Sequence, residues 1–86
     1  MKKIIEVGDG EGFEKLLGER ITLFCANYIY TGKLVGVDHA YVLLENPAIV
    51  YETGPLDTKE WKDAQHLPNE WFIMISAIES FGVLKK

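Results

Sequence analysis

Two glycines placed four residues apart in one long strand pattern constrain this chain more than any other feature. Residues 28–37 read YIYTGKLVGV, and Gly32 and Gly36 fall on the same alternating face as Tyr28 and Tyr30. Because glycine has no side chain, a strand can bend sharply at such positions without crowding the inside of a curved sheet. The pattern therefore predicts a strongly bent β-sheet.

Strand patterns recur along most of the remaining chain. The expected strands are residues 21–25, 28–37, 41–44, 71–75 and 78–84. The third continues to residue 51 if Pro47 lies at an edge or bulge. A helical face formed by Phe13, Leu16 and Leu17 ahead of Gly18 predicts one or two helical turns before the sheet, and residues 2–7 predict a short strand or arm. The fold class is mostly β: a short N-terminal helix and then a strongly bent five-stranded antiparallel sheet that forms a small open barrel.

The composition is that of one small globular domain over residues 1–86, with 26% charged residues and a net charge of −4. This charge argues against a basic protein that coats phosphates generally. One cysteine and two separated histidines form no zinc-ligand pattern, so we expect no metal and no other cofactor. No segment approaches the ~20 apolar residues that span a bilayer, and Glu6 interrupts a secretory-signal pattern. A cytoplasmic protein without membrane contact is expected.

Residues 52–70 predict an elaborated acidic loop between the third and fourth strands, with a helical turn or two over 56–65. Residues 45–70 hold six acidic residues against two lysines, which accounts for the whole net charge of −4. This segment would repel RNA locally. It is therefore a candidate binding element for a protein partner.

Three stretches resemble motifs of the Sm-like family, which includes the Sm, LSm and bacterial Hfq proteins. Residues 32–38, GKLVGVD, are similar to the family's Gly-x-φ-x-x-φ-Asp signature, and residues 38–46, DHAYVLLEN, resemble its Hfq form. Residues 77–81, AIESF, resemble the end of the second family motif. The resemblance covers roughly residues 13–50 and 71–84. It implies an Sm-like fold, a closed ring of identical subunits and binding of single-stranded RNA.

The candidate RNA-binding residues are Tyr28, Tyr30, His39 and Ser76. The resemblance implies an RNA-binding ring face near the two tyrosines, where they would offer stacking platforms, and a pore beside His39 and Ser76. Packing in the core or an interface is the alternative role for the tyrosines, and an exposed turn residue is the alternative for His39. Asp38 is expected to order a turn by accepting backbone N–H groups.

The candidate subunit-interface residues are Trp71, Ile73, Ile75 and Phe81. The resemblance implies that the fourth strand of one subunit pairs with the fifth strand of the next. Residues 71–75 are apolar on both alternating faces, as expected if one face meets the core and the other meets a neighbouring copy. A head-to-tail contact of this kind closes into a ring when the rotation fits.

An alternative function and an alternative fold remain open. Ala40 stands where the family commonly has a base-stacking aromatic or histidine, and Val42, Ile75 and Ser76 replace residues that contact RNA or line the pore in Sm or LSm members. A ring scaffold for protein–protein assembly without nucleic acid is therefore the alternative function. A small SH3-like barrel would share the strand count and the glycines. No nucleophile motif or phosphate-binding loop occurs, so we expect no catalytic residues and no enzyme.

Overall fold

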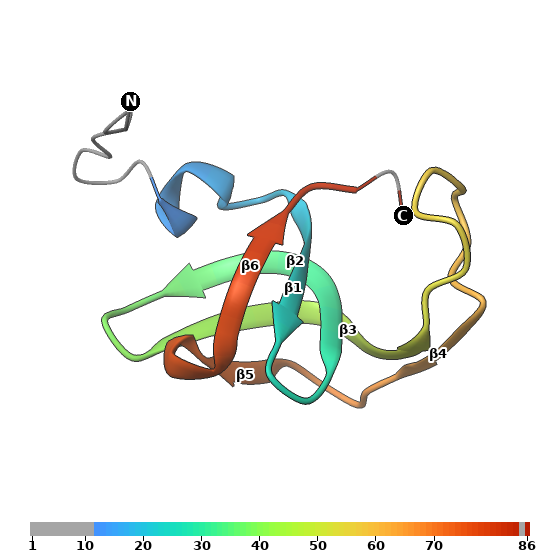
Figure 1. The fold of residues 1–86 in the computed structure, drawn as a ribbon. Coiled ribbons are helices and arrows are strands. Elements are labelled where there is room, and N and C mark those ends of the chain that lie inside the picture. The colour runs from blue at the N-terminus through green and yellow to red at the C-terminus, as the bar shows by residue number, and fades with distance from the viewer. Residues whose placement is uncertain (1–11, 85) are drawn as a thin grey trace, which may run out of the picture.

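The computed structural model describes residues 12–84 and 86, so the strand or arm predicted for residues 2–7 lies outside the described part of the chain. The elements follow the order η1 (Phe13–Leu16), β1 (Arg20–Cys25), β2 (Ile29–Val37), β3 (Tyr41–Glu52), β4 (Asp63–His66), β5 (Trp71–Met74), η2 (Ile75–Ala77) and β6 (Ile78–Gly82) (Figure 1). The fold is mostly β, with one six-stranded antiparallel sheet.

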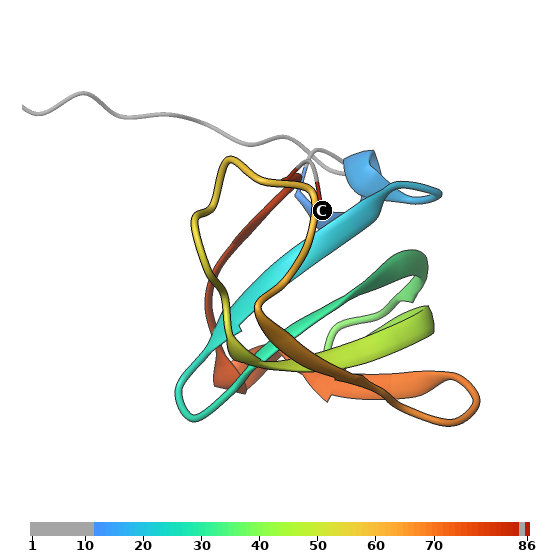
Figure 2. The same ribbon diagram turned by 90° about the vertical axis from the view of Figure 1, so that its right-hand side faces the viewer.

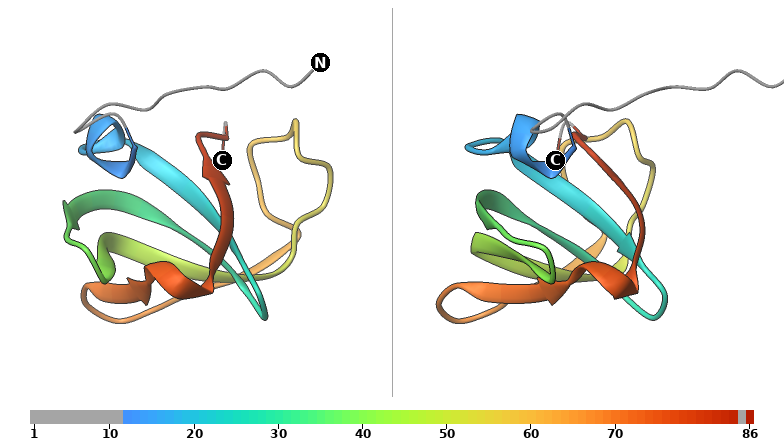
Figure 3. Two further views of the ribbon diagram at one scale, coloured as in Figure 1. Left: turned by 60° about the vertical axis from the view of Figure 1, so that its left-hand side comes forward. Right: turned by 90° about the vertical axis from the view of Figure 1, so that its left-hand side faces the viewer.

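The long strand β3 organises the sheet, whose order is β4-β3-β2-β1-β6. On the side away from β2, the first part of β3 pairs with β5 and its second part pairs with β4. The sheet is not closed: β5 and β6 follow each other through η2 but do not pair as strands within the described residues (Figure 3). A strongly bent, open sheet is the result.

The five predicted strands are all present, and the segment before them differs from the prediction. Residues Phe13–Leu16 form one turn of 3-10 helix, and residues 12–84 contain no α-helix. Gly18 adopts a positive φ of 89° and ends the turn. Only five residues separate Gly12 from Gly18, too few to repay the cost of nucleating an α-helix.

The predicted helical turns over 56–65 are wrong, and residues 52–70 are not loop throughout. Residues 53–62 contain no helix, and a sixth strand, β4, follows them. All four β4 side chains are exposed. The strand therefore has no buried face that would require apolar residues at alternate positions, and its sequence shows no such alternation. Its strand conformation comes from pairing with the edge of β3, where Ala48 lies opposite His66.

The bend is located at the glycines. The register between β2 and β3 shifts between Thr31 and Lys33 and again between Leu34 and Gly36. A Cβ atom on Gly32 would lie 3.0 Å from the Leu44 Cβ and 3.2 Å from the Pro47 Cα, so glycine permits this close approach. Pro47 lies at the first irregularity, as the sequence requires for a proline within a strand.

The core lies on the inside of the bend. Its buried members are Ile21, Leu23, Leu34, Val42, Leu44 and Ile73, contributed by β1, β2, β3 and β5. Phe13 and Leu16 of η1 pack against this cluster from one end. These four strands thus present apolar residues to one interior, which is the main stabilising interaction of a domain this small.

We predict that Gly32→Ala lowers the free energy of unfolding by about 1–3 kcal/mol, because the added methyl group overpacks the contact between β2 and β3. Gly82→Ala is the control, since a Cβ atom there meets nothing within 4 Å. Chemical denaturation at matched protein concentration measures both variants. Equal stabilities of the two variants would contradict the proposed role of Gly32.

Candidate nucleic-acid interface

Two of the candidate RNA-binding residues lie together where β1 turns into β2. The ring centroids of Tyr28 and Tyr30 are 6.4 Å apart, with an interplanar angle of 66°, so the rings meet edge to face. The Tyr28 side chain is 50% exposed. Tyr30 is partly buried and packs against the core. Tyr28 therefore offers the larger surface for a stacked base, and the Tyr30 ring packs against the Tyr28 ring.

A third tyrosine, which sequence reasoning missed, completes this surface. Tyr30 lies opposite Ile49 in the β2–β3 ladder, and continuing that register sets Tyr28 opposite Tyr51, which is 53% exposed. Burial raises the pKa of the Tyr30 hydroxyl, and the nearby Cys25, Tyr28 and Tyr51 raise it further. We refer to Tyr28, Tyr30 and Tyr51 as the tyrosine cluster.

Carboxylates border the tyrosine cluster. Burial raises the pKa of the Cys25 thiol, and the Glu79 carboxylate raises it further. Glu52 follows Tyr51 and forms an exposed ion pair of 3.2 Å with Lys62. Among the described residues, the charged groups identified near the cluster are the carboxylates of Glu79 and Glu52 and the Lys62 ammonium that pairs with Glu52. Base stacking, rather than phosphate attraction, is therefore the contact that the cluster favours.

The short η2 turn lies between two loops that carry other candidate residues (Figure 3). The Ala26 N–H donates to the Ala77 carbonyl at 2.9 Å, and the Ile75 N–H donates to the Ala40 carbonyl at 2.9 Å. These bonds bring Ser76 of η2 and His39 of the β2–β3 turn to the same end of the sheet. Both side chains are exposed.

Asp38 organises the β2–β3 turn. Its Oδ1 atom accepts hydrogen bonds from the Ala40 N–H at 2.7 Å and from the Tyr41 N–H at 2.8 Å. These two bonds lower the pKa of the Asp38 carboxyl, and the nearby His39 lowers it slightly further. The carboxylate thereby fixes the turn that exposes His39.

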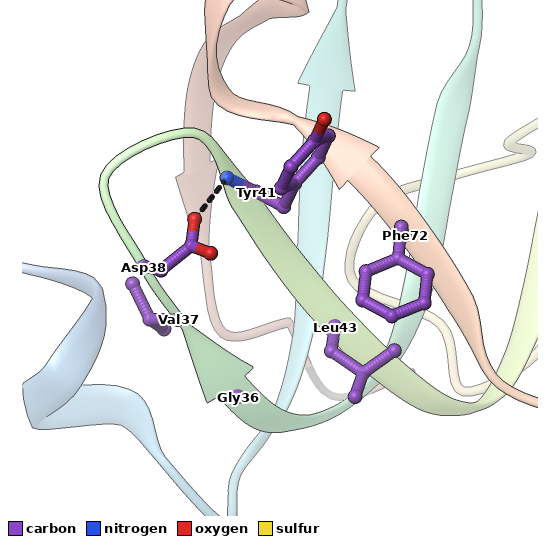
Figure 4. A pocket seen from close by; sticks show the side chains of 6 residues that line it. All are labelled: Gly36, Val37, Asp38, Tyr41, Leu43 and Phe72. Atoms are coloured by element: carbon purple, nitrogen blue, oxygen red, sulfur yellow. Dashed lines mark hydrogen bonds between the residues drawn. The ribbon is translucent and has the colours of Figure 1, made fainter.

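A shallow apolar hollow lies beside this turn, on the outer face of β2, β3 and β5 (Figure 4). Its lining residues are Gly36, Val37, Asp38, Tyr41, Leu43 and Phe72. The Tyr41 and Phe72 rings meet edge to face with centroids 6.1 Å apart. Its volume is about 170 Å³, well below the ~300 Å³ at which small-molecule pockets begin.

The candidate interface residues are not equally available to a neighbour. Ile73 is 5% exposed and belongs to the core, and Ile75 packs against the core. Between and beside them, Phe72 is 63% exposed and Met74 is 56% exposed. These two side chains, which sequence reasoning did not select, therefore form the outward apolar face of β5.

Trp71 and Phe81, the remaining candidate interface residues, lie on β5 and β6. Trp71, at the start of β5, is partly exposed. Phe81 of β6 is partly exposed as well and stacks on Phe13 of η1, with ring centroids 3.9 Å apart. β5 and β6, two of the three strands at the edges of the sheet, thus each carry a large apolar side chain at the surface.

A second hollow is acidic. Its lining residues are Glu45, Asn46, Leu67, Asn69 and Glu70. Its volume is about 310 Å³, and its two carboxylates disfavour an anionic ligand. Among residues 12–84 and 86, no group of three or more His, Cys, Asp or Glu side chains is arranged to hold a metal ion. No helix in that part of the chain has the length and apolar character to cross a membrane.

Comparison of the chain with protein-family models, with curated proteins and with solved structures finds no match. The geometry of the described residues and the motifs in the sequence therefore carry the functional argument by themselves.

The lowered Asp38 pKa predicts a pH dependence for the turn. Since the folded pKa lies below the ordinary value of 3.8, the carboxylate stabilises the turn above that pH and stops doing so as the pH falls through the lowered value. We expect the Ala40 and Tyr41 amide resonances to titrate with a midpoint below 3.8. In Asp38→Asn, which keeps an acceptor oxygen but does not titrate, NMR should show no such transition. A midpoint at or above the ordinary value would contradict the assignment.

Proposed function

We propose that this chain is a ring-forming binding module of the Sm-like type that takes single-stranded RNA on its tyrosine cluster. The strand order β6-β1-β2-β3-β5 supports the resemblance, which implies a bent five-stranded sheet. The short η2 turn joins β5 to β6. In this proposal β4 is an addition that pairs with the far half of β3.

Two edge strands support the ring. Within the described residues, β5 pairs only with β3 and β6 pairs only with β1, so each leaves one row of backbone groups without a strand partner. A β5 edge that pairs with the β6 edge of the next copy would satisfy both rows. Phe72 and Met74, exposed on β5, would be covered by the same contact. This head-to-tail contact uses different surfaces of each copy and can repeat until a ring closes.

The tyrosine cluster is the observation that carries the RNA part of the proposal. Base-on-aromatic stacking is worth about 1–3 kcal/mol per base and requires no particular base. The Tyr28 and Tyr51 side chains are about half exposed, and the Tyr30 ring meets the Tyr28 ring edge to face. Repeated around a ring, this surface would bind successive bases of one strand. His39 and Ser76, exposed near η2, would hydrogen-bond to RNA at the pore of the ring.

We predict that Met74→Glu and Phe72→Glu convert the ring to monomers, because a carboxylate at either position would be buried without a partner in the contact between β5 and β6. Native mass spectrometry of the unaltered protein should show one closed oligomer. Leu56→Glu, the same type of change at an exposed residue of the 53–62 loop, is the control and should leave the oligomer intact.

Circular dichroism should show that all three variants keep their strand content, since each altered side chain is exposed in the single chain. An unaltered protein that is monomeric at micromolar concentration would overturn the ring. It would favour an isolated SH3-like barrel.

We predict that Tyr28→Ala weakens binding of short uridine-rich or adenine-rich RNA by about tenfold, the effect of losing one stacked base. Tyr51→Ala should weaken it similarly. Tyr41→Ala is the control, because Tyr41 is also exposed but contacts Phe72 outside the cluster. Fluorescence anisotropy with labelled RNA measures the dissociation constants.

The salt dependence of the same titration separates stacking from phosphate attraction. Because carboxylates border the cluster and Lys62 is paired with Glu52, we expect only a shallow decrease of affinity with rising salt. A larger loss in Tyr41→Ala than in Tyr28→Ala would contradict the assigned surface. No binding of either RNA at low salt would overturn the RNA proposal and favour the protein-assembly scaffold.

A further inference from the structure

The 53–62 loop closes on itself. The Lys62 N–H donates to the Thr53 carbonyl at 3.3 Å, which joins the two ends of the loop. Inside it, the Thr58 hydroxyl donates to the Pro55 carbonyl at 2.8 Å. Gly54 adopts a positive φ of 66° where the chain turns. A surface loop with adjoining ends and internal hydrogen bonds is an Ω-loop, a type that frequently carries function.

One ammonium group occupies the mouth of this loop. The Lys86 Nζ donates to the Thr53 carbonyl at 2.8 Å, to the Glu60 carbonyl at 2.8 Å and to the Thr58 hydroxyl at 3.4 Å. It also lies 4.3 Å from the centroid of the Trp61 ring. Figures 1 and 2 show the end of the chain marked C beside this loop. We call these four loop residues the ammonium cage.

The cage matches the chemistry of a primary ammonium. Such a group has three N–H donors and no acceptor, and the cage presents three oxygen acceptors and one aromatic face. The Trp61 Nε1 atom is buried and has no hydrogen-bond partner among the described residues, so a bond at the ring edge does not account for the ring's position. The ring face contacts the Lys86 ammonium instead.

We propose that the ammonium cage is a binding site specific for primary ammonium groups and that Lys86 of the same chain is its resident ligand. The carbonyl oxygens of Thr53 and Glu60 attract a cation through their dipoles. The cage contacts include no carboxylate, which would accept any positively charged group. The acidic residues of the surrounding segment add a diffuse attraction. A lysine of a partner protein would have to displace Lys86 to enter. The proposal uses neither the tyrosine cluster nor the β5 and β6 edges, so it stands independently of RNA binding and of the ring.

Removal of Lys86 tests the site directly. In Lys86→Ala, we expect a Glu-specific protease to cleave after Glu60 about five- to tenfold faster, because the carbonyl of that bond loses its donor and the loop opens more often. Lys86→Met, which keeps the aliphatic chain and loses the donors, should behave like the alanine variant. Lys59→Ala removes the same charge from the same loop without touching the cage, and its cleavage rate should match that of the unaltered protein.

Chemical rescue then identifies the ligand class. Ethylammonium added to Lys86→Ala should restore slow cleavage and the Trp61 emission spectrum of the parent, observed with Trp71→Phe in both proteins. Tetraethylammonium carries the same charge without N–H donors and should restore neither. Equal rescue by both ions would overturn the specificity for primary ammonium. Equal cleavage of Lys86→Ala and Lys59→Ala would overturn the site itself.

Discussion

The close approach of β2 to β3 at Gly32 is the constraint on which the rest of the structure depends. The Pro47 Cα and the Leu44 Cβ both lie within 3.2 Å of where a Gly32 side chain would begin. The register shift at this point lets the ladder bend, so Leu34 and Leu44 reach the core on one side of it. On its other side, Tyr30 and Ile49 pair toward the β1–β2 turn. Without the bend one sheet of this length could not enclose a core.

The same bend divides β3 into two halves with different partners. Its first half pairs with β5 and its second half with β4, both on the edge away from β2. Because β5 pairs with the first half of β3, it covers the core with Ile73 and leaves Phe72 and Met74 outside. The alternation of buried and exposed apolar side chains on one strand is therefore a consequence of its position. It is also what makes β5 suited to a contact with another copy.

Local pattern predicted most of the sheet because strand alternation and glycine spacing are local signals. It failed where long-range pairing decides the structure. Residues 63–66 have no strand pattern of their own, and only the edge of β3 makes them β4. The phase of the apolar run at residues 71–75 could not be inferred because every position in it is apolar. Tyr51 was missed for a similar reason: its place beside Tyr28 follows from a register across two strands, which spacing along one strand does not reveal.

The distribution of charge connects the two surfaces proposed here. The segment that holds the whole excess negative charge is ordered through a cation, since the ammonium of Lys86 binds the carbonyls of Thr53 and Glu60 within it. The tyrosine cluster adjoins the same segment, because Tyr51 precedes Glu52 in β3. A nucleic acid on that cluster must therefore gain from stacking more than it loses by repulsion from nearby carboxylates. Bases exposed on a flexible single strand can approach with their phosphates turned outward, whereas those of a duplex cannot. Under the proposed function, this arrangement of charge and aromatic surface would favour single-stranded over double-stranded ligands.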